Sequence, residues 1–139
     1  SNAYRHYQDG KYQSAVDELK LIEQQFKNQG ETNKQTLGLL SYWKGICLNR
    51  LQNFSEAASS FESAINIGYA PADIHYEYGQ ALFAAEKLIE ARLQFRESLK
   101  RKFKRGVSLY YIAYISKELG ENKKAFTFYR MIDKLEDAE

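Results

Sequence analysis

The sequence is poor in residues that carry special chemistry or interrupt helices. Among 139 residues it has one cysteine, one proline, one methionine and one tryptophan. A single cysteine excludes an internal disulfide, and no CxxC pair or Cys/His cluster suggests a metal ion. One proline and eight glycines give little punctuation for many short strands, so long helices are favoured. No apolar run approaches the ~20 residues that a membrane-spanning helix needs.

An excess of charge of one sign is also lacking. The 20 Lys and Arg against 18 Asp and Glu leave a net charge of +2, which is too mild to indicate a nucleic-acid binder. The length fits one domain, at roughly 100–200 residues per domain. Aromatic side chains are what the chain has in quantity: they make up 14% of it, and 11 of them are tyrosines.

An internal repeat of 34 residues organises the chain. Ala57, Ala91 and Ala125 are spaced 34 residues apart. An earlier copy opens with Asp-Gly-Lys-Tyr at residues 9–12, and its Ala15 precedes Ala57 by 42 residues, so eight extra residues lie between these two copies. Within each copy, apolar residues three and four apart predict two amphipathic helices.

A 34-residue period with small residues at fixed places resembles the tetratricopeptide repeat (TPR) family. The resemblance implies an all-α, right-handed α-solenoid of antiparallel helix pairs, in which each pair contacts only its neighbours. The family's first-helix tryptophan is replaced by Ser41, His75 and Leu109, and Trp43 is two residues out of register. The copies are expected near residues 4–30, 38–70, 72–105 and 106–137, with the first copy truncated at its N-terminus.

Punctuation and side-chain size predict where the helices begin, end and pack. Leu119-Gly120 indicates a helix end, because glycine adopts positive φ easily. The segment 68–71 is expected to end one helix and to place Pro71 in the first turn of the next. Asn53 and Glu56 resemble a capping box. The predicted helices cover residues 4–8, 12–28, 33–51, 54–67, 72–85, 88–102, 106–119 and 122–136.

Residue size predicts the contacts inside and between copies. Gly45 and Gly79, again 34 apart, would let two helices approach closely. The large rings of Phe61, Phe95 and Tyr129 are expected to fill space between neighbouring copies. The charged side chains of the last helix fit a solvated cap, namely Arg130, Asp133, Lys134, Glu136 and Asp137.

The sequence favours a protein without catalytic chemistry. His6 and His75 are too far apart to form a local metal pair, and each is interpreted as a semi-buried histidine with a satisfied ring. Cys47 lies between Ile46 and Leu48 and is interpreted as a small buried apolar residue. No GxSxG, HExxH or phosphate-loop pattern occurs. We therefore expect no enzyme activity, no cofactor and no metal.

Aromatic residues form the most informative pattern. The TPR resemblance implies that the first helix of each copy lines a concave groove, and Tyr42, Tyr76 and Tyr110 recur there at a spacing of 34. Tyr4 and Tyr7 are the equivalents in the truncated first copy. These rings could instead pack between adjacent first helices, and both interpretations stay open. The predicted ligand groove comprises Tyr42, Trp43, Ile46, Asn49, Tyr76, Glu77, Gln80, Phe83, Tyr110, Tyr111, Tyr114 and Lys117.

One dense basic run covers residues 100–105. Cations near a helix C-terminus are stabilised by the helix dipole, which is the plain interpretation. The functional alternative is contact with an anion, with Lys104 and Arg105 at the rim of the groove. TPR members that grip a carboxylate use Lys, Asn and Arg on this face, where the present chain has Tyr42, Ile46 and Tyr76, so a carboxylate clamp is not expected.

The leading hypothesis is a non-enzymatic protein-interaction scaffold that binds a peptide or protein segment in the groove, without nucleic acid and without a membrane span. The alternatives are a structural module that assembles with itself or within a larger assembly such as one of the bacterial envelope, an accessory domain of an enzyme, and a sugar-binding surface. Residues 1–3 resemble the remnant of an expression tag, so the chain is interpreted as part of a longer protein. Cytoplasmic and periplasmic locations are both compatible with it.

Overall fold

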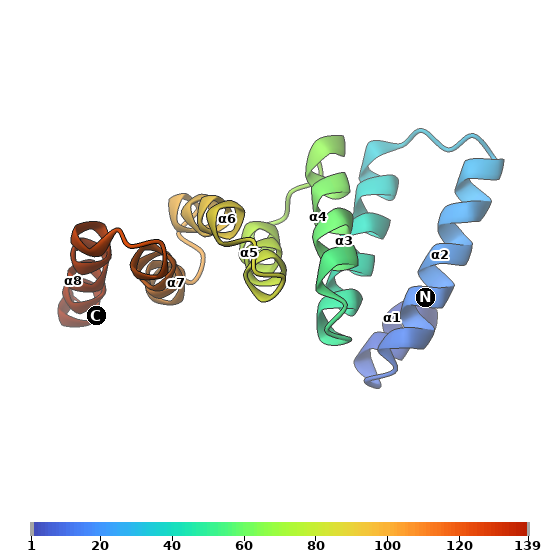
Figure 1. Ribbon diagram of the computed structural model, residues 1–139. Coiled ribbons are helices and arrows are strands. Elements are labelled where there is room, and N and C mark those ends of the chain that lie inside the picture. The colour runs from blue at the N-terminus through green and yellow to red at the C-terminus, as the bar shows by residue number, and fades with distance from the viewer. Residues whose placement is uncertain (1, 139) are drawn as a thin grey trace. The chain divides into compact units, whose positions relative to one another are not determined.

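The protein is built from helices alone in the part of the chain that its computed structural model describes, residues 2–138, with side chains described through residue 136. The all-α prediction is confirmed, and every predicted helix is present with ends that differ by at most two residues from the expected ones. Figure 1 shows the helices in chain order. Their bounds are α1 Asn2–Gln8, α2 Tyr12–Asn28, α3 Lys34–Arg50, α4 Phe54–Ile67, α5 Ile74–Ala84, α6 Leu88–Lys100, α7 Arg105–Glu118 and α8 Asn122–Ala138.

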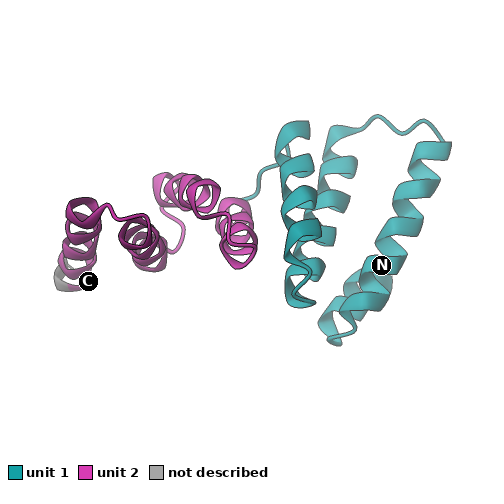
Figure 2. Cartoon of the chain, viewed as in Figure 1, with its two compact units in different colours: residues 1–71 teal, residues 72–139 magenta. Residues whose placement is uncertain are grey.

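The chain forms two compact units, which divide where two copies of the repeat meet. Unit 1 is Ser1–Pro71 and unit 2 is Ala72–Glu139 (Figure 2). In unit 1, α1 packs on α2, α2 on α3 and α3 on α4; in unit 2, α5 packs on α6, α6 on α7 and α7 on α8. Within each unit, every helix therefore packs on its neighbours in the sequence, as the helical-repeat prediction requires.

Helices α1 to α7 all end in the same way, with a left-handed residue that allows two backbone bonds to close the last turn. After α4, the N–H groups of Gly68 and Tyr69 donate to the carbonyls of Ile65 and Ala64, both at 2.9 Å. The positive φ predicted at Gly120 is confirmed, at +80°. Three of these positions hold a residue other than glycine. The left-handed residues are Gly10, Gly30, Gln52, Gly68, Glu86, Lys102 and Gly120.

Two predicted helix starts are wrong in detail. Asn53 and Glu56 do not form a capping box, because the Asn53 N–H already donates to the Leu48 carbonyl at 2.9 Å. The Asn53 side chain instead donates to Glu56 Oε1 at 3.2 Å. Pro71 lies before the first turn, since α5 begins only at Ile74. The side-chain cap that the sequence analysis missed is Asn33, whose Oδ1 accepts from the Thr36 N–H at 3.0 Å.

Glycine and phenylalanine hold each central helix pair together. A Cβ placed on Gly45 would lie 2.6 Å from the nearest atom of the Phe61 ring, and one on Gly79 would lie 3.0 Å from the Phe95 ring. The predicted close approach of the helices is confirmed. Both rings are fully buried. Phe95 also stacks on Tyr111 of the next helix pair, as predicted. Both phenylalanine rings, however, also pack against the glycine of their own pair.

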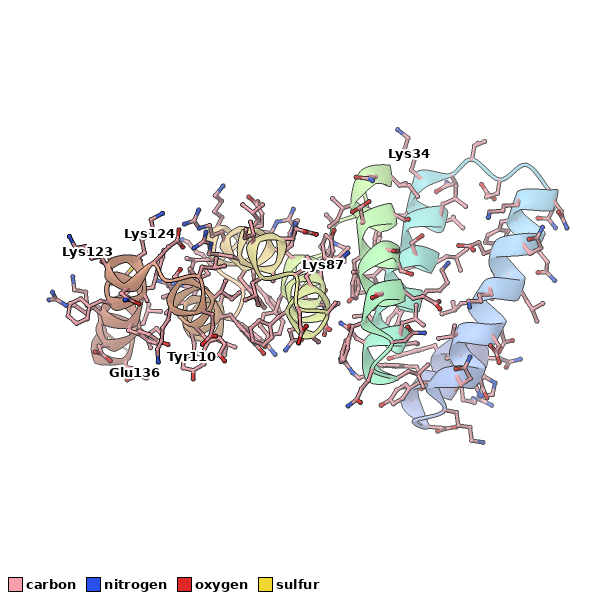
Figure 3. All side chains as sticks on the ribbon, in the orientation of Figure 1. Lys34, Lys87, Tyr110, Lys123, Lys124 and Glu136 are labelled. Carbon is pink, nitrogen blue, oxygen red and sulfur yellow. The ribbon has the colours of Figure 1, made fainter. Side chains whose placement is uncertain are left out.

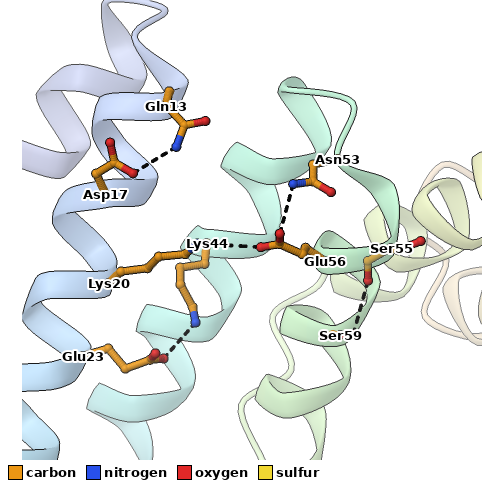
Figure 4. Close-up of polar contacts among 9 residues, drawn as sticks. All are labelled: Gln13, Asp17, Lys20, Glu23, Lys44, Asn53, Ser55, Glu56 and Ser59. Atoms are coloured by element: carbon orange, nitrogen blue, oxygen red, sulfur yellow. Dashed lines mark hydrogen bonds and ion pairs between the residues drawn. The ribbon is translucent and has the colours of Figure 1, made fainter.

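Polar contacts also join neighbouring copies within unit 1. Glu23 of α2 pairs with Lys44 of α3 at 2.9 Å, and Lys20 of α2 pairs with Glu56 of α4 at 3.8 Å (Figure 4). The second pair is half exposed, and exposed pairs contribute only about 0–1 kcal/mol. Packing of the apolar faces therefore has to supply most of the stability of unit 1.

Unit 2 has a more polar junction between its copies. Arg92 of α6 donates to Glu121 in the α7–α8 turn and, at 3.2 Å, to Ser116 Oγ of α7. The buried hydroxyls of Ser98 and Ser108 donate to the Phe103 carbonyl at 2.9 and 3.2 Å. These bonds hold the α6–α7 turn, including its aromatic residue, in one conformation.

Candidate functional site

The predicted tyrosine register is first of all a packing register. Each of its members faces an aromatic ring of the second helix in the same copy, and this contact repeats with the 34-residue period. The ring centroids are 6.4 Å apart for Tyr42 and Phe61, 6.0 Å for Tyr76 and Phe95, and 6.1 Å for Tyr110 and Tyr129.

A further ring from the turn after the second helix covers two of the three tyrosines. Tyr69 lies 5.9 Å from Tyr42, and Phe103 lies 5.9 Å from Tyr76. Tyr69 and Phe103 are themselves 34 residues apart, which is the signal that could have found them in the sequence. The next position in this series is Asp137, whose side chain lies outside the described residues. Tyr76 is accordingly buried, with 7% of its surface exposed, whereas Tyr110 is 54% exposed.

Four predicted groove residues surround one hollow in unit 2. A cavity of about 380 Å³ lies between α5 and α7 and is lined by Phe83, Val107, Tyr110, Tyr111 and Tyr114. The Phe83 ring is 5.2 Å from Tyr111 and 5.8 Å from Tyr114. We call this cavity the aromatic hollow.

One wall of the aromatic hollow is rigid and the other is open. Tyr111 stacks on the buried Phe95 ring with centroids 4.3 Å apart and planes 3° from parallel. Tyr110 and Tyr114, by contrast, are exposed over 54% and 37% of their surfaces. Figure 3 shows Tyr110 projecting from α7 within unit 2. A partner would therefore meet the exposed rings of Tyr110 and Tyr114 beside Tyr111, which is already held in place by Phe95.

The other predicted groove residues of unit 2 do not line the aromatic hollow. Glu77 is buried, Gln80 is half-buried and donates to the Tyr76 hydroxyl at 3.1 Å, and Lys117 is exposed on α7. Burial raises the pKa of the Tyr76 hydroxyl, and the neighbouring Tyr111 and Glu77 add to the rise. Tyr76 therefore remains protonated and serves the packing of unit 2.

In unit 1, three of the predicted aromatic residues, Tyr4, Tyr7 and Trp43, line a different cavity. Trp43 contacts Tyr4 at 5.6 Å, Tyr7 at 5.2 Å and Tyr42 at 5.5 Å. Two further predicted residues, Ile46 and Asn49, are buried on α3. The cavity has a volume of about 220 Å³ and is lined by Ala3, Tyr4, Tyr7, Leu19, Leu39, Leu40, Trp43 and Cys47.

The side chains of the two residues predicted as a basic rim lie in different surroundings. Lys104 places its ammonium group 4.8 Å from the centroid of the Tyr76 ring, a cation–π contact inside unit 2. Arg105 lines another hollow, between α6, α7 and α8. Contact of either residue with a ligand stays a prediction.

The histidines and the cysteine have the surroundings expected of structural residues. His75 Nδ1 lies 2.7 Å from Gln94 Oε1, and His6 Nε2 lies 3.5 Å from Glu18 Oε2. Burial raises the pKa of the Cys47 thiol to about 11, so it is protonated at neutral pH. Residues 2–138 contain no group of three His, Cys, Asp or Glu side chains that could hold a metal ion. None of the helices described is long and apolar enough to cross a membrane.

The fold defines a class by architecture: an all-helical protein of TPR-like helix pairs. Solved structures of MamA have a similar fold. The chain matches the MamA RS-1 ArsTM double mutant with a TM-score of 0.79 at 18% identity, covering 98% of this chain and 72% of that one.

Two further MamA structures give the same result. MamA 41-end from Desulfovibrio magneticus RS-1 matches with a TM-score of 0.79 at 18% identity, over 99% of this chain and 73% of that one. MamA of AMB-1 matches with a TM-score of 0.71 at 14% identity, over 99% and 90%. No protein-family model and no curated protein matches the sequence. At these identities the likeness concerns the fold alone.

Proposed function

We propose that this protein is a non-enzymatic interaction module that binds a protein or peptide segment through the aromatic hollow of unit 2. The observation that carries the proposal is the exposure of Tyr110 and Tyr114 beside a preformed aromatic wall. Tyrosine is favoured at interfaces because it brings a large rigid surface and a hydroxyl at low entropic cost.

The expected ligand is a segment with apolar or aromatic anchors. The walls of the aromatic hollow are rings and one valine, so a bound side chain gains by leaving water. The hydroxyls of Tyr110 and Tyr114 can hydrogen-bond the backbone of an extended segment. Lys117, exposed one turn beyond Tyr114 on α7, would favour an acidic residue beside the anchor.

A peptide selection tests the proposal. A library of random peptides is selected on the wild-type chain, and each enriched peptide is measured again on the Tyr110→Ser/Tyr114→Ser variant. Both side chains are exposed, so the variant should keep its circular dichroism spectrum, although loss of the ring contacts with Tyr129 and Phe83 should lower its melting temperature slightly. We expect peptides with aromatic or leucine anchors that bind the variant about tenfold or more weakly.

A matched control variant separates the hollow from general stickiness. Phe126 on α8 is 64% exposed and does not line the aromatic hollow, so Phe126→Ser should leave the affinity unchanged. Equal losses in both variants, or enriched peptides that bind Tyr110→Ser/Tyr114→Ser as well as the wild type, would show that the hollow is not the binding site.

One observation favours a second candidate function, self-association. A hollow of about 470 Å³ opens between α7 and α8 and is lined by Gly106, Val107, Tyr110, Ile132, Leu135 and Glu136. Light scattering over a concentration series tests this function. A dimer at micromolar concentration that dissociates in Val107→Lys would favour assembly, and a monomer throughout would exclude it.

A further inference from the structure

A second hollow of unit 2 combines an apolar floor with a basic rim. Its volume is about 390 Å³, and it lies between the C-terminal end of α6, the start of α7 and the C-terminal half of α8. Four of its lining residues are apolar and four are cationic, and no acidic side chain is among them. They are Leu99, Leu109, Met131 and Leu135, with Lys100, Lys102, Arg105 and Lys134. We call it the basic hollow.

The 34-residue repeat does not require apolar residues at the floor of the basic hollow. Thirty-four residues earlier in the sequence, the positions of Leu109, Met131 and Leu135 hold His75, Glu97 and Arg101. A helix pair of this kind therefore folds with polar residues at these places. Three of the four apolar residues, Leu109, Met131 and Leu135, belong to the last copy, and Met131 is 40% exposed.

Helix dipoles account for Lys100 but not for Arg105. Lys100 lies in the last turn of α6, where a cation is stabilised and where it also pairs with Glu97 at 3.1 Å. Arg105 is the first residue of α7, where the dipole opposes a cation. Lys102 has φ of +59°, a conformation that glycine adopts at the equivalent Gly68. A side chain there costs about 1–2 kcal/mol.

We propose that the basic hollow binds an acidic amphipathic protein segment, which places apolar anchors on the floor and carboxylates against the rim. Charge complementarity decides the class of partner, since three elements supply cations and the lining supplies no anion. The recessed floor favours a peptide over a membrane surface. A side chain can enter a hollow of about 390 Å³, and a flat bilayer cannot.

The basic hollow is independent of the aromatic hollow, because the two share no lining residue. The experiment uses the full chain and a fluorescein-labelled amphipathic peptide made of Glu, Asp and Leu. A second peptide, with Lys in place of each acidic residue, is the charge control. We expect binding of the acidic peptide alone, weakening as NaCl is raised, because salt screens exposed charges.

Charge reversal identifies the site. Lys102→Glu/Arg105→Glu should weaken binding of the acidic peptide about tenfold or more. The matched control is Lys87→Glu/Lys123→Glu, which makes the same change in net charge at two exposed lysines of unit 2 outside the hollow (Figure 3). All four positions are exposed, so both variants should fold, as circular dichroism will show. Equal weakening in both variants overturns the proposal.

The floor is tested separately. Met131→Ser should weaken binding several-fold, and Phe126→Ser, also on α8, should not. Two other outcomes overturn the proposal. One is binding of anionic phospholipid vesicles, lost in Lys102→Glu/Arg105→Glu, without binding of the peptide. The other is a concentration-dependent dimer that buries Met131. The two proposals can fail separately. Lys102→Glu/Arg105→Glu should lose the acidic peptide and keep the peptides selected for the aromatic hollow, and Tyr110→Ser/Tyr114→Ser should do the reverse.

Discussion

Unit 1 and unit 2 contain the same aromatic register, but the tyrosines of this register are covered to different extents in the two units. In unit 1, Tyr42 is covered by Phe61 and Tyr69, and Trp43 next to it is enclosed by rings of α1. In unit 2, Tyr76 is covered in the same way, but Tyr110 meets only Tyr129 among the ring contacts described and is 54% exposed. A repeated position therefore has one packing role and two different accessibilities.

The difference shows what a repeat determines and what it leaves open. The 34-residue spacing places each tyrosine against the second helix of its own copy, because that contact is internal to the copy. Whether the ring remains accessible depends on further contacts from outside the helix pair: Tyr69 lies against Tyr42 and Phe103 lies against Tyr76. Unit 2 can present a surface because Tyr110 is 54% exposed.

The largest expected effect comes from the ring at the centre of each unit. Phe61→Ala and Phe95→Ala should each lower the free energy of unfolding by about 3–5 kcal/mol, since both rings are fully buried. Trp43, the one tryptophan, reports on unit 1, while circular dichroism reports on both units. We expect Phe61→Ala to shift the tryptophan transition first and Phe95→Ala to shift only the helix signal. Coincident transitions in both variants would contradict separate units.

A smaller effect is expected where the helices approach most closely. Gly45→Ala should destabilise the protein by about 1–3 kcal/mol, because its Cβ would lie 2.6 Å from Phe61. Gly79→Ala should be near neutral, because the 3.0 Å contact with Phe95 needs less adjustment and alanine gains about 1 kcal/mol of helix propensity. Urea unfolding of both variants checks the order, and a larger loss for Gly79→Ala would refute it.

The left-handed helix ends allow a test of about 1 kcal/mol. Gly120→Ala should lower the free energy of unfolding by about 1–2 kcal/mol, because alanine is strained at positive φ. Gln52→Gly in unit 1 and Glu86→Gly in unit 2 relieve that strain and should raise the free energy of unfolding by up to about 1 kcal/mol. The greater entropy of glycine in the unfolded chain reduces this gain. Thermal melts measure all three. Destabilisation by both glycine substitutions would show that these turns are not strained.

The smallest effect concerns pH and unit 2 alone. The hydrogen bond from Arg92 lowers the pKa of Glu121 below its ordinary value, with further lowering by the Arg92 and Lys124 charges. Because the folded pKa is the depressed one, this contribution to stability is present above the unfolded pKa and is lost as pH falls through the folded pKa. Glu121→Gln and Arg92→Gln should both flatten the acid limb of a stability–pH profile. An unchanged slope in either variant contradicts the assignment.

Most of the fold could be predicted from the sequence, because helix pairing is encoded by local spacing. Ala57 and Ala91, like Gly45 and Gly79, mark the same contacts in two copies. Gly68 and Gly120 mark helix ends. The failed cap at Asn53 shows the limit of local reading. Its backbone N–H was already committed to Leu48 by the preceding helix, which a four-residue motif does not reveal.

The candidate site was predictable in part. Phe83, Tyr110, Tyr111 and Tyr114 do meet around one hollow, because they lie on the same faces of α5 and α7. Burial of Tyr76 was not predictable from the tyrosine register, since it depends on Phe103 in a turn. The basic hollow was missed as a cavity because its floor residues are spread over three helices, although the basic run itself was visible.

The one thiol of this chain can report on the opening of unit 1. Cys47 is 1% exposed and its raised pKa keeps it protonated, so a thiol reagent at neutral pH cannot attack it in the closed state. Labelling can proceed only as fast as unit 1 opens. At a reagent concentration where modification is faster than reclosing, the time course followed by mass therefore measures the lifetime of the folded unit 1 in the intact chain. A ligand that acts on unit 2 alone should leave that lifetime unchanged.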